Sequence, residues 1–155
     1  MGLNKYAALV EYDGTPFLGY QSQVGGRTVQ DELESALRKL TGSQRRIQAA
    51  SRTDSGVHAE GQVVSFWIGD RFGVSNIVKG LNYYLPDEIA IRGVCPIDAD
   101  FDVRRMAIGR SYRYRIVSRV ARAPLKERFA LRIGKSLDVG RMREACRFLQ
   151  GTHDF

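Results

Sequence analysis

The spacing of apolar and polar residues predicts a regular order of strands and helices over the first two thirds of the chain. Residues 5–12 place apolar side chains on both phases of a strand, which indicates a strand covered on both faces. Two later segments repeat apolar residues at helical spacing and stop at Gly42 and at Pro86, residue types that end helices. The predicted strands cover residues 5–12, 47–50, 62–68 and 89–97, and the predicted helices cover residues 29–40 and 74–85. The order strand–helix–strand–strand–helix–strand predicts an α/β (α+β) protein with a ferredoxin-like, or RRM-like, sheet.

The last third of the chain has a less regular pattern. Phe101–Arg104 has the composition of a further extended segment, and Ser111–Ser118 alternates as a strand does, with Tyr112 and Tyr114 on one face. We expect Tyr114 to pack in the core. A final amphipathic helix follows Asp138, whose side chain can cap its first turn.

The length of 155 residues suits one domain, or one lobe of a larger protein. We expect residues 1–103 to form an N-terminal ferredoxin-like subdomain that carries the loop at residues 50–59. We expect residues 104–155 to begin a second α/β subdomain that is incomplete.

The net charge of +7 is concentrated in one part of the chain. Residues 104–132 carry 10 Lys or Arg against the single acidic residue Glu127. Nineteen of the 24 basic residues are arginines, which suit bidentate contacts to phosphate and stacking on bases. A solvated basic face would also explain this segment. We favour a nucleic-acid partner because aromatic residues are interleaved with the arginines.

Composition and cysteine usage indicate a cytoplasmic protein. The sequence is 43% hydrophobic, and no window approaches the roughly 18 apolar residues that span a bilayer. The N-terminus has no charged segment followed by an apolar run, so we expect neither a secretory signal nor a membrane partner. Cys95 and Cys146 lie far apart among apolar neighbours, where we expect them to pack as small hydrophobic side chains in a reducing compartment.

Candidate chemistry gathers in the loop Ala50–Ala59, between two predicted strands. It contains a cation, hydroxyls, a carboxylate, a glycine and an imidazole. On composition alone, Thr53–Gly56 is best interpreted as a structural turn. The only other histidine besides His58 is His153, so we expect no metal site. Loops held by rigid elements are nevertheless where catalytic residues are commonly placed.

The loop and the strand after it read SRTDSGVHAEGQVVSF, and three other segments read EYDGTPFLGYQSQ, TVQDELESAL and FDVRRMAIGRSYRYRI. The first of these is similar to GRTDAGVHA followed by GQV, the signature of the TruA family of tRNA pseudouridine synthases. The others resemble that family's first strand and loop, its first helix, and its strand with the YRY motif, in the family's order. The resemblance covers nearly the whole chain and implies the pseudouridine synthase catalytic fold.

The resemblance implies roles for individual residues. Asp54 would supply the carboxylate at the glycosidic centre, as nucleophile or as base, and the sequence does not choose between them. The ring of Tyr112 would stack on the target uracil, and Arg52 would occupy the space that the flipped base leaves. Candidates for contacts to the RNA backbone are Arg104, Arg110 and Arg113. The isomerisation involves no redox change, so no cofactor is expected.

The resemblance also implies partners. Family members modify uridines at positions 38, 39 and 40 of the tRNA anticodon stem–loop, and they act as homodimers. They continue through a second α/β half of comparable size. We therefore expect this chain to be a truncated portion that is weakly active or inactive alone.

The sequence departs from the family pattern at several positions. Ser51 replaces the usual Gly, Ser55 replaces the usual Ala, and Tyr20 stands where Trp is common. If position 51 required a positive φ, a serine there would be strained.

A second hypothesis is a non-catalytic RNA-binding module, because a ferredoxin-like sheet with tyrosines and a basic segment can bind RNA by stacking alone. Asp54 distinguishes the two hypotheses. A carboxylate repels phosphate, so a module that only binds RNA has no use for one in this loop.

Overall fold

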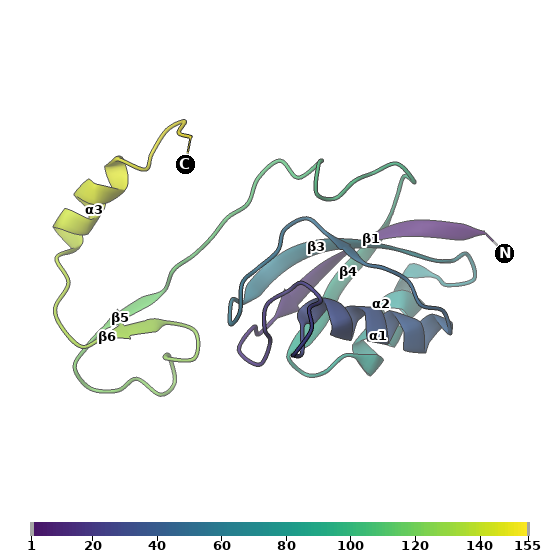
Figure 1. Ribbon diagram of the computed structural model, residues 1–155, viewed down its shortest axis with the longest axis horizontal. Helices are drawn as coiled ribbons and strands as arrows, with labels where there is room; N and C mark the ends of the chain where they lie inside the picture. The colour runs from purple at the N-terminus through teal and green to yellow at the C-terminus, as the bar shows by residue number, and fades with distance from the viewer. Residues whose placement is uncertain (1, 155) are drawn as a thin grey trace. The chain divides into compact units, whose positions relative to one another are not determined.

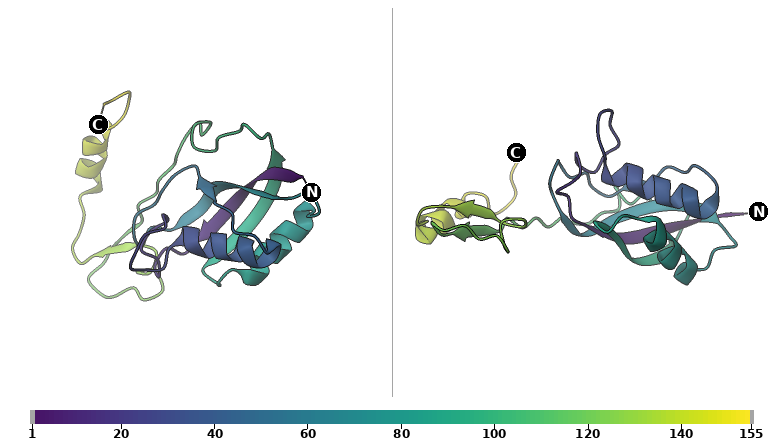
Figure 2. Two further views of the ribbon diagram at one scale, coloured as in Figure 1. Left: turned by 45° about the vertical axis from the view of Figure 1, so that its right-hand side comes forward. Right: turned by 90° about the horizontal axis from the view of Figure 1, so that it is seen from below.

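The computed structural model describes residues 2–154, which divide after Arg110 into two compact units. The first unit is a four-stranded antiparallel sheet with two helices on one face (Figures 1 and 2). Its elements are β1 (Leu3–Tyr12), α1 (Val29–Thr41), β2 (Gln48–Ala49), β3 (Ala59–Gly69), α2 (Val74–Tyr84) and β4 (Ile89–Ile97). The strand order β2-β3-β1-β4 is that of a ferredoxin-like sheet, so the predicted fold class is confirmed.

The core of the first unit lies between the sheet and the two helices. Every second residue of β1 from Tyr6 to Tyr12 is buried on that side. These side chains pack with Val64 and Phe66 of β3 and with the apolar stripes of α1 and α2. The apolar stripes of α1 and α2 were predicted correctly, but the expectation that β1 is covered on both faces was wrong, because Leu9 on its other face is 38% exposed.

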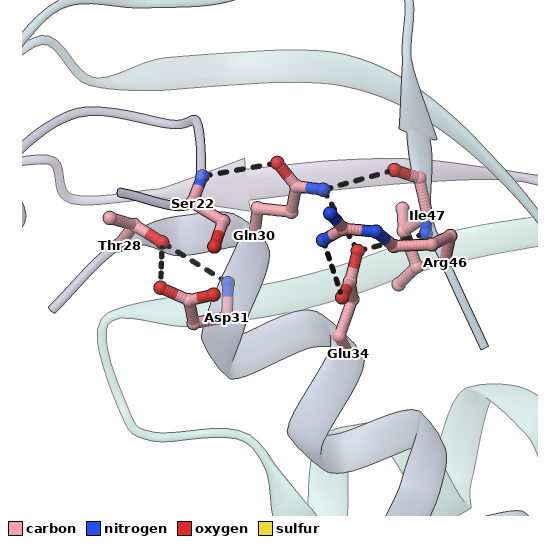
Figure 3. Close-up of polar contacts among 7 residues, drawn as sticks. All are labelled: Ser22, Thr28, Gln30, Asp31, Glu34, Arg46 and Ile47. Atoms are coloured by element: carbon pink, nitrogen blue, oxygen red, sulfur yellow. Dashed lines mark hydrogen bonds and ion pairs between the residues drawn. The ribbon is translucent and has the colours of Figure 1, made fainter. Parts of the chain in front are cut away.

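Local hydrogen bonds close both ends of α1, and the helix ends at Gly42 as predicted. The Thr28 hydroxyl accepts a hydrogen bond from the backbone N–H of Asp31 at 3.2 Å and so caps the first turn (Figure 3). Gly42 has a φ of 75° and donates its N–H to the carbonyl of Arg38, which closes the last turn.

The segment after β4 crosses the helix-free face of the sheet. Lys5 of β1 points to this face and its Nζ donates to the carbonyls of Ala99 and Phe101. Further along, the Arg110 guanidinium donates to the carbonyl of Ala50 at 2.8 Å. These bonds attach residues 98–110 to the first unit, which therefore extends seven residues beyond the boundary expected at residue 103.

The expectation that Phe101–Arg104 is extended was wrong. The Asp102 carboxylate accepts hydrogen bonds from the N–H groups of Arg104 and Arg105, and these bonds lower its pKa. The carbonyl of Asp102 also accepts from the N–H of Met106. An aspartate that bonds to the backbone just after it favours a turn over a strand.

The second unit contains β5 (Ile116–Ser118), β6 (Leu131–Ile133) and α3 (Val139–Arg147). Only the last three residues of the predicted strand Ser111–Ser118 form a strand, because β6 pairs with these residues alone. Tyr114 is 92% exposed, so its predicted place in the core was also wrong. Asp138 does cap α3 through the N–H of Arg141, as predicted, but no residue of α3 is buried.

Both cysteines differ from expectation. Cys95 lies on β4 and Cys146 on α3, and both are exposed rather than packed as small hydrophobic side chains. Apolar neighbours in sequence do not bury a side chain when it points away from the core. None of the helices within residues 2–154 is both long and apolar enough to cross a bilayer.

Candidate active site

The loop of residues 50–59 lies at the end of the sheet where β1 finishes. It leaves the short edge strand β2 and returns into β3, whose first residue, Ala59, pairs with Tyr12 at the end of β1. The loop is therefore attached at both ends to neighbouring strands of one sheet. Such an attachment suits a site that needs accurate geometry.

The side chains along the first half of the loop alternate between inward and outward positions. Ser51 and Thr53 are half-buried, whereas Arg52 and Asp54 are exposed. The Thr53 hydroxyl lies 2.7 Å from the hydroxyl of Tyr12. The alternation places the guanidinium and the carboxylate of the loop in solvent, with only Thr53 between them in sequence.

The second half of the loop is bonded to the segment that follows β1. The backbone N–H of Tyr20 donates to the carbonyl of Thr53 at 3.0 Å. The carbonyl of Phe17 accepts from the Ser55 hydroxyl at 3.2 Å and from the N–H of Gly56 at 3.4 Å. Ser55, which stands where the family pattern has alanine, therefore makes a hydrogen bond that an alanine could not make.

Two glycines allow the loops to approach this closely. A Cβ on Gly14 would lie 2.0 Å from the carbonyl oxygen of Val57. Gly19 has a φ of 96°, and a Cβ there would lie 3.0 Å from the carbonyl oxygen of Thr53. Ser51, in contrast, needs no such freedom, because no described residue other than glycine has a positive φ.

His58 joins the same two loops through one ring nitrogen. Its Nδ1 lies 3.1 Å from the backbone nitrogen of Gly14 and 3.0 Å from a carboxylate oxygen of Asp13. The nitrogen cannot accept from the first and donate to the second at the same time. Unprotonated, it accepts from Gly14, and protonated, it pairs with Asp13, so either form holds the loop to residues 13–14.

Helix α1 supports the chain on the way into β2 (Figure 3). Gln30 accepts from the N–H of Ser22 at 3.1 Å and donates to Glu34 at 2.8 Å. Glu34 in turn accepts from the N–H of Ile47 at 3.1 Å. A carboxylate and an amide on one helical face thus hold the segments on both sides of it.

The predicted RNA-contacting residues differ in their surroundings. Arg110 uses one guanidinium nitrogen to hold the carbonyl of Ala50, two residues before Arg52. Arg104 is exposed on the turn that follows Asp102. Tyr112, which is 69% exposed, and Arg113 belong to the second unit.

The residues beneath the loop were missed by sequence reasoning. Tyr12 and Gln62 were interpreted only as strand residues, although both carry polar groups at buried positions. Burial raises the pKa of Tyr12, and hydrogen bonds to Thr53 and Gln62 oppose that shift. The available signal was a hydroxyl at the end of the core-facing side of the strand, next to the loop in the sheet. Within residues 2–154 there is no group of three His, Cys, Asp or Glu side chains that could hold a metal ion.

Comparison with known proteins identifies the family of this chain. A family model described as tRNA pseudouridine synthase matches residues 8–104, which is more than half of the chain. The chain belongs to this family. The matched residues run from β1 to Arg104 and include the whole loop of Arg52 and Asp54, whereas Tyr112 and Arg113 lie outside the match.

Curated relatives named tRNA pseudouridine synthase A agree with this membership. The relative from Roseiflexus castenholzii is 42% identical over 153 residues, covering 99% of this chain and 57% of its own length. The relative from Chloroflexus aurantiacus is 46% identical over 149 residues, covering 96% and 54%. The one from Geobacillus kaustophilus is 43% identical over 148 residues, covering 95% and 57%. The chain thus spans somewhat more than half the length of these pseudouridine synthase relatives.

Proposed function

We propose that this chain is part of an enzyme that isomerises uridine to pseudouridine in tRNA, with Asp54 as the catalytic carboxylate. The observation that carries the proposal is the exposed carboxylate of Asp54 on a loop bonded to the structure from both sides. Catalytic residues are commonly placed on loops that a rigid scaffold holds in position. Family membership supplies the reaction class.

The reaction needs one carboxylate and no redox partner. The bond between ribose C1′ and uracil N1 breaks, the base turns, and a bond between C1′ and C5 forms. The proton on C5 is lost and N1 gains one from solvent, so atoms and electrons balance. Asp54 attacks C1′ as a nucleophile or removes the proton as a base, and either role requires the ionised carboxylate.

Arg52 is the proposed partner of Asp54 in handling the flipped nucleotide. It is exposed on the same outward-facing phase of the loop. Its planar guanidinium can stack on bases and bond to phosphate at once, which suits the space left in a stem when a base turns out. Arg104, Arg110 and Arg113 are proposed to contact the RNA backbone, and Tyr112 is proposed to stack on the uracil.

The proposed substrate is the anticodon stem–loop of tRNA, at positions 38, 39 and 40. The curated relatives carry tRNA in their names, and residues 104–132 carry 10 basic residues against one acidic residue, Glu127. We propose a homodimer acting in the cytoplasm, where tRNA is modified and exposed thiols such as Cys95 remain reduced. Binding through phosphates would weaken steeply as the salt concentration rises.

The test is tritium release from C5-labelled uridine in an unmodified tRNA transcript. We would assay the 155-residue chain beside the same chain joined to the C-terminal part of the Roseiflexus castenholzii relative. We expect release from the joined protein and little or none from the chain alone. Rapid release by the chain alone would contradict the expectation that it is insufficient.

Asp54→Asn in the joined protein tests the role of the carboxylate. Loss of the nucleophile or base should lower turnover by at least roughly 10³-fold, while tRNA affinity stays the same or rises because a negative charge is removed. Asp100→Asn is the matched control, since Asp100 is also an exposed aspartate of the first unit. Equal loss of binding and turnover in Asp54→Asn would indicate a structural role for this residue.

The competing function is an RNA-binding module without chemistry. The specific observations in its favour are the ferredoxin-like strand order and the excess of basic residues at 104–132, which together suit RNA binding without chemistry. Salt-sensitive tRNA binding with no tritium release from the joined protein would establish the binding module and refute the enzyme.

A further inference from the structure

A buried polar cluster lies directly beneath the candidate active-site loop. It consists of the Tyr12 hydroxyl, the Gln62 carboxamide, the Thr53 hydroxyl and the carbonyl of Ser51. Tyr12 is 2% exposed and Gln62 is 7% exposed. Burying a hydroxyl and an amide is unfavourable unless both are hydrogen-bonded, so the targets of their bonds indicate what they do.

Both side chains bond to the loop just before Asp54. The Tyr12 hydroxyl lies 2.7 Å from the Thr53 hydroxyl, and the Gln62 Nε2 donates to the carbonyl of Ser51 at 2.8 Å. The other end of the Gln62 carboxamide accepts from the N–H of Val63 at 3.1 Å. That second bond holds the carboxamide oxygen of Gln62 against β3, so the carboxamide nitrogen points at the loop.

The supporting residues lie on the two most extensively paired strands of the sheet. Tyr12 is the last residue of β1, and Gln62, on β3, pairs with Val10. The fixed spacing of neighbouring strands therefore fixes the separation between the two attachment points, at Ser51 and at Thr53. The backbone of Arg52 is held between them, and Asp54 follows the second one directly.

We propose that Tyr12 and Gln62 are positioning residues that set the direction of the Asp54 carboxylate through Thr53 and Ser51. The inference rests on the proposed function, in which that carboxylate reacts at a defined carbon or proton. A displacement of about 1 Å can cost on the order of 100-fold in rate when a reacting group is misplaced. In this proposal neither residue contacts the substrate: Tyr12 acts through the Thr53 hydroxyl, and Gln62 acts through the carbonyl of Ser51.

The first test measures the restraint itself, without any need for activity. In the 155-residue chain, Tyr12→Phe removes the hydroxyl that bonds to Thr53 and keeps the ring. Loss of one hydrogen bond should speed amide hydrogen exchange in residues 51–57 by about fivefold to tenfold, with little change in α2. Tyr6→Phe is the matched control, because Tyr6 lies on the same face of β1 at the far side of the core. Unchanged exchange in Tyr12→Phe would overturn the proposal.

The second test separates positioning from stability, in the protein joined to the C-terminal part of the relative. At a temperature where all variants are folded, Tyr12→Phe and Thr53→Val should each lower kcat by roughly 10- to 100-fold, with KM for tRNA changed less than about threefold. The double variant should be no slower than the slower single variant, because both remove the same interaction. Gln62→Met should lower kcat in the same way, whereas Tyr6→Phe should leave it unchanged.

The outcomes distinguish this proposal from the proposed function. A folded Tyr12→Phe variant with unchanged kcat, or kcat losses that multiply in the double variant, would refute the positioning role. If the unmodified joined protein releases no tritium, the proposed function fails. The hydrogen-exchange comparison then still decides whether Tyr12 restrains the loop.

Discussion

At the scale of single residues, Tyr20 is one of the described side chains that bury a polar atom without a hydrogen-bond partner. It stands where the TruA family commonly has Trp, and it is 2% exposed. Its hydroxyl is buried and has no hydrogen-bond partner among the described residues. Burial raises its pKa, and the nearby Tyr12 and Glu34 raise it further. The ring suits the site, but the hydroxyl has lost its water without gaining a partner.

We therefore predict that Tyr20→Phe stabilises the protein. Removing an unsatisfied buried hydroxyl should raise the free energy of unfolding by about 1 kcal/mol. Urea denaturation of the 155-residue chain measures the change. Tyr12→Phe is the matched comparison and should have the opposite sign, because its hydroxyl bonds to Thr53. A loss of stability in Tyr20→Phe would mean that the hydroxyl has a partner in solution.

At the scale of elements, the contact between two loops decides where Asp54 lies. The turn after β1 touches the candidate active-site loop so closely that a Cβ on Gly14 would meet the backbone of Val57 at 2.0 and 2.5 Å. Backbone atoms cannot move aside as a flexible side chain can. The two loops therefore act as one structural unit, although Gly14 and His58, which join them, lie 44 positions apart in sequence.

We predict that Gly14→Ala separates these loops. The backbone of residues 13–15 must shift, which breaks the bond from Gly14 to His58 and costs about 1–3 kcal/mol, as overpacking usually does. Urea denaturation gives the loss of stability, and faster exchange at residues 54–58 locates it. Gly93→Ala in β4 is the control, since a Cβ there meets nothing within 4 Å. Equal effects of the two substitutions would refute the close-approach argument.

The elements that could be predicted from the sequence are those that depend on residues close together in the chain. The helices and strands of the first unit were predictable because apolar spacing and end signals such as Thr28 and Gly42 act over a few residues. The loop of Asp54 was recognisable by its motif. The bond from Tyr12 to Thr53 was not, since it joins residues 41 apart. The strand predicted at 111–118 is mostly absent because alternation alone does not provide a pairing partner.

At the scale of the whole molecule, the two units differ in how much core they have. The first unit buries side chains from β1, β3, β4 and both helices in one cluster. In the second unit, Ala123 is the only buried hydrophobic residue among those that the structure describes, and no residue of α3 is buried. Hydrophobic burial is the main stabilising contribution to folding. The second unit therefore has little burial to offset the conformational entropy that its chain loses on folding.

We predict that the two units exchange amide hydrogens at very different rates. Amides in the middle of β1 and β3, around Ala8 and Val64, should exchange only on global unfolding, because both strands pair on two sides. Amides of β5, β6 and α3 should exchange at least roughly 100-fold faster, through local opening that exposes little apolar surface. Peptide-resolved hydrogen exchange of the 155-residue chain at neutral pH measures both, with the unfolded chain in denaturant as the reference. Equal protection of α3 and β1 would contradict the prediction, since it would require a core that the second unit does not show.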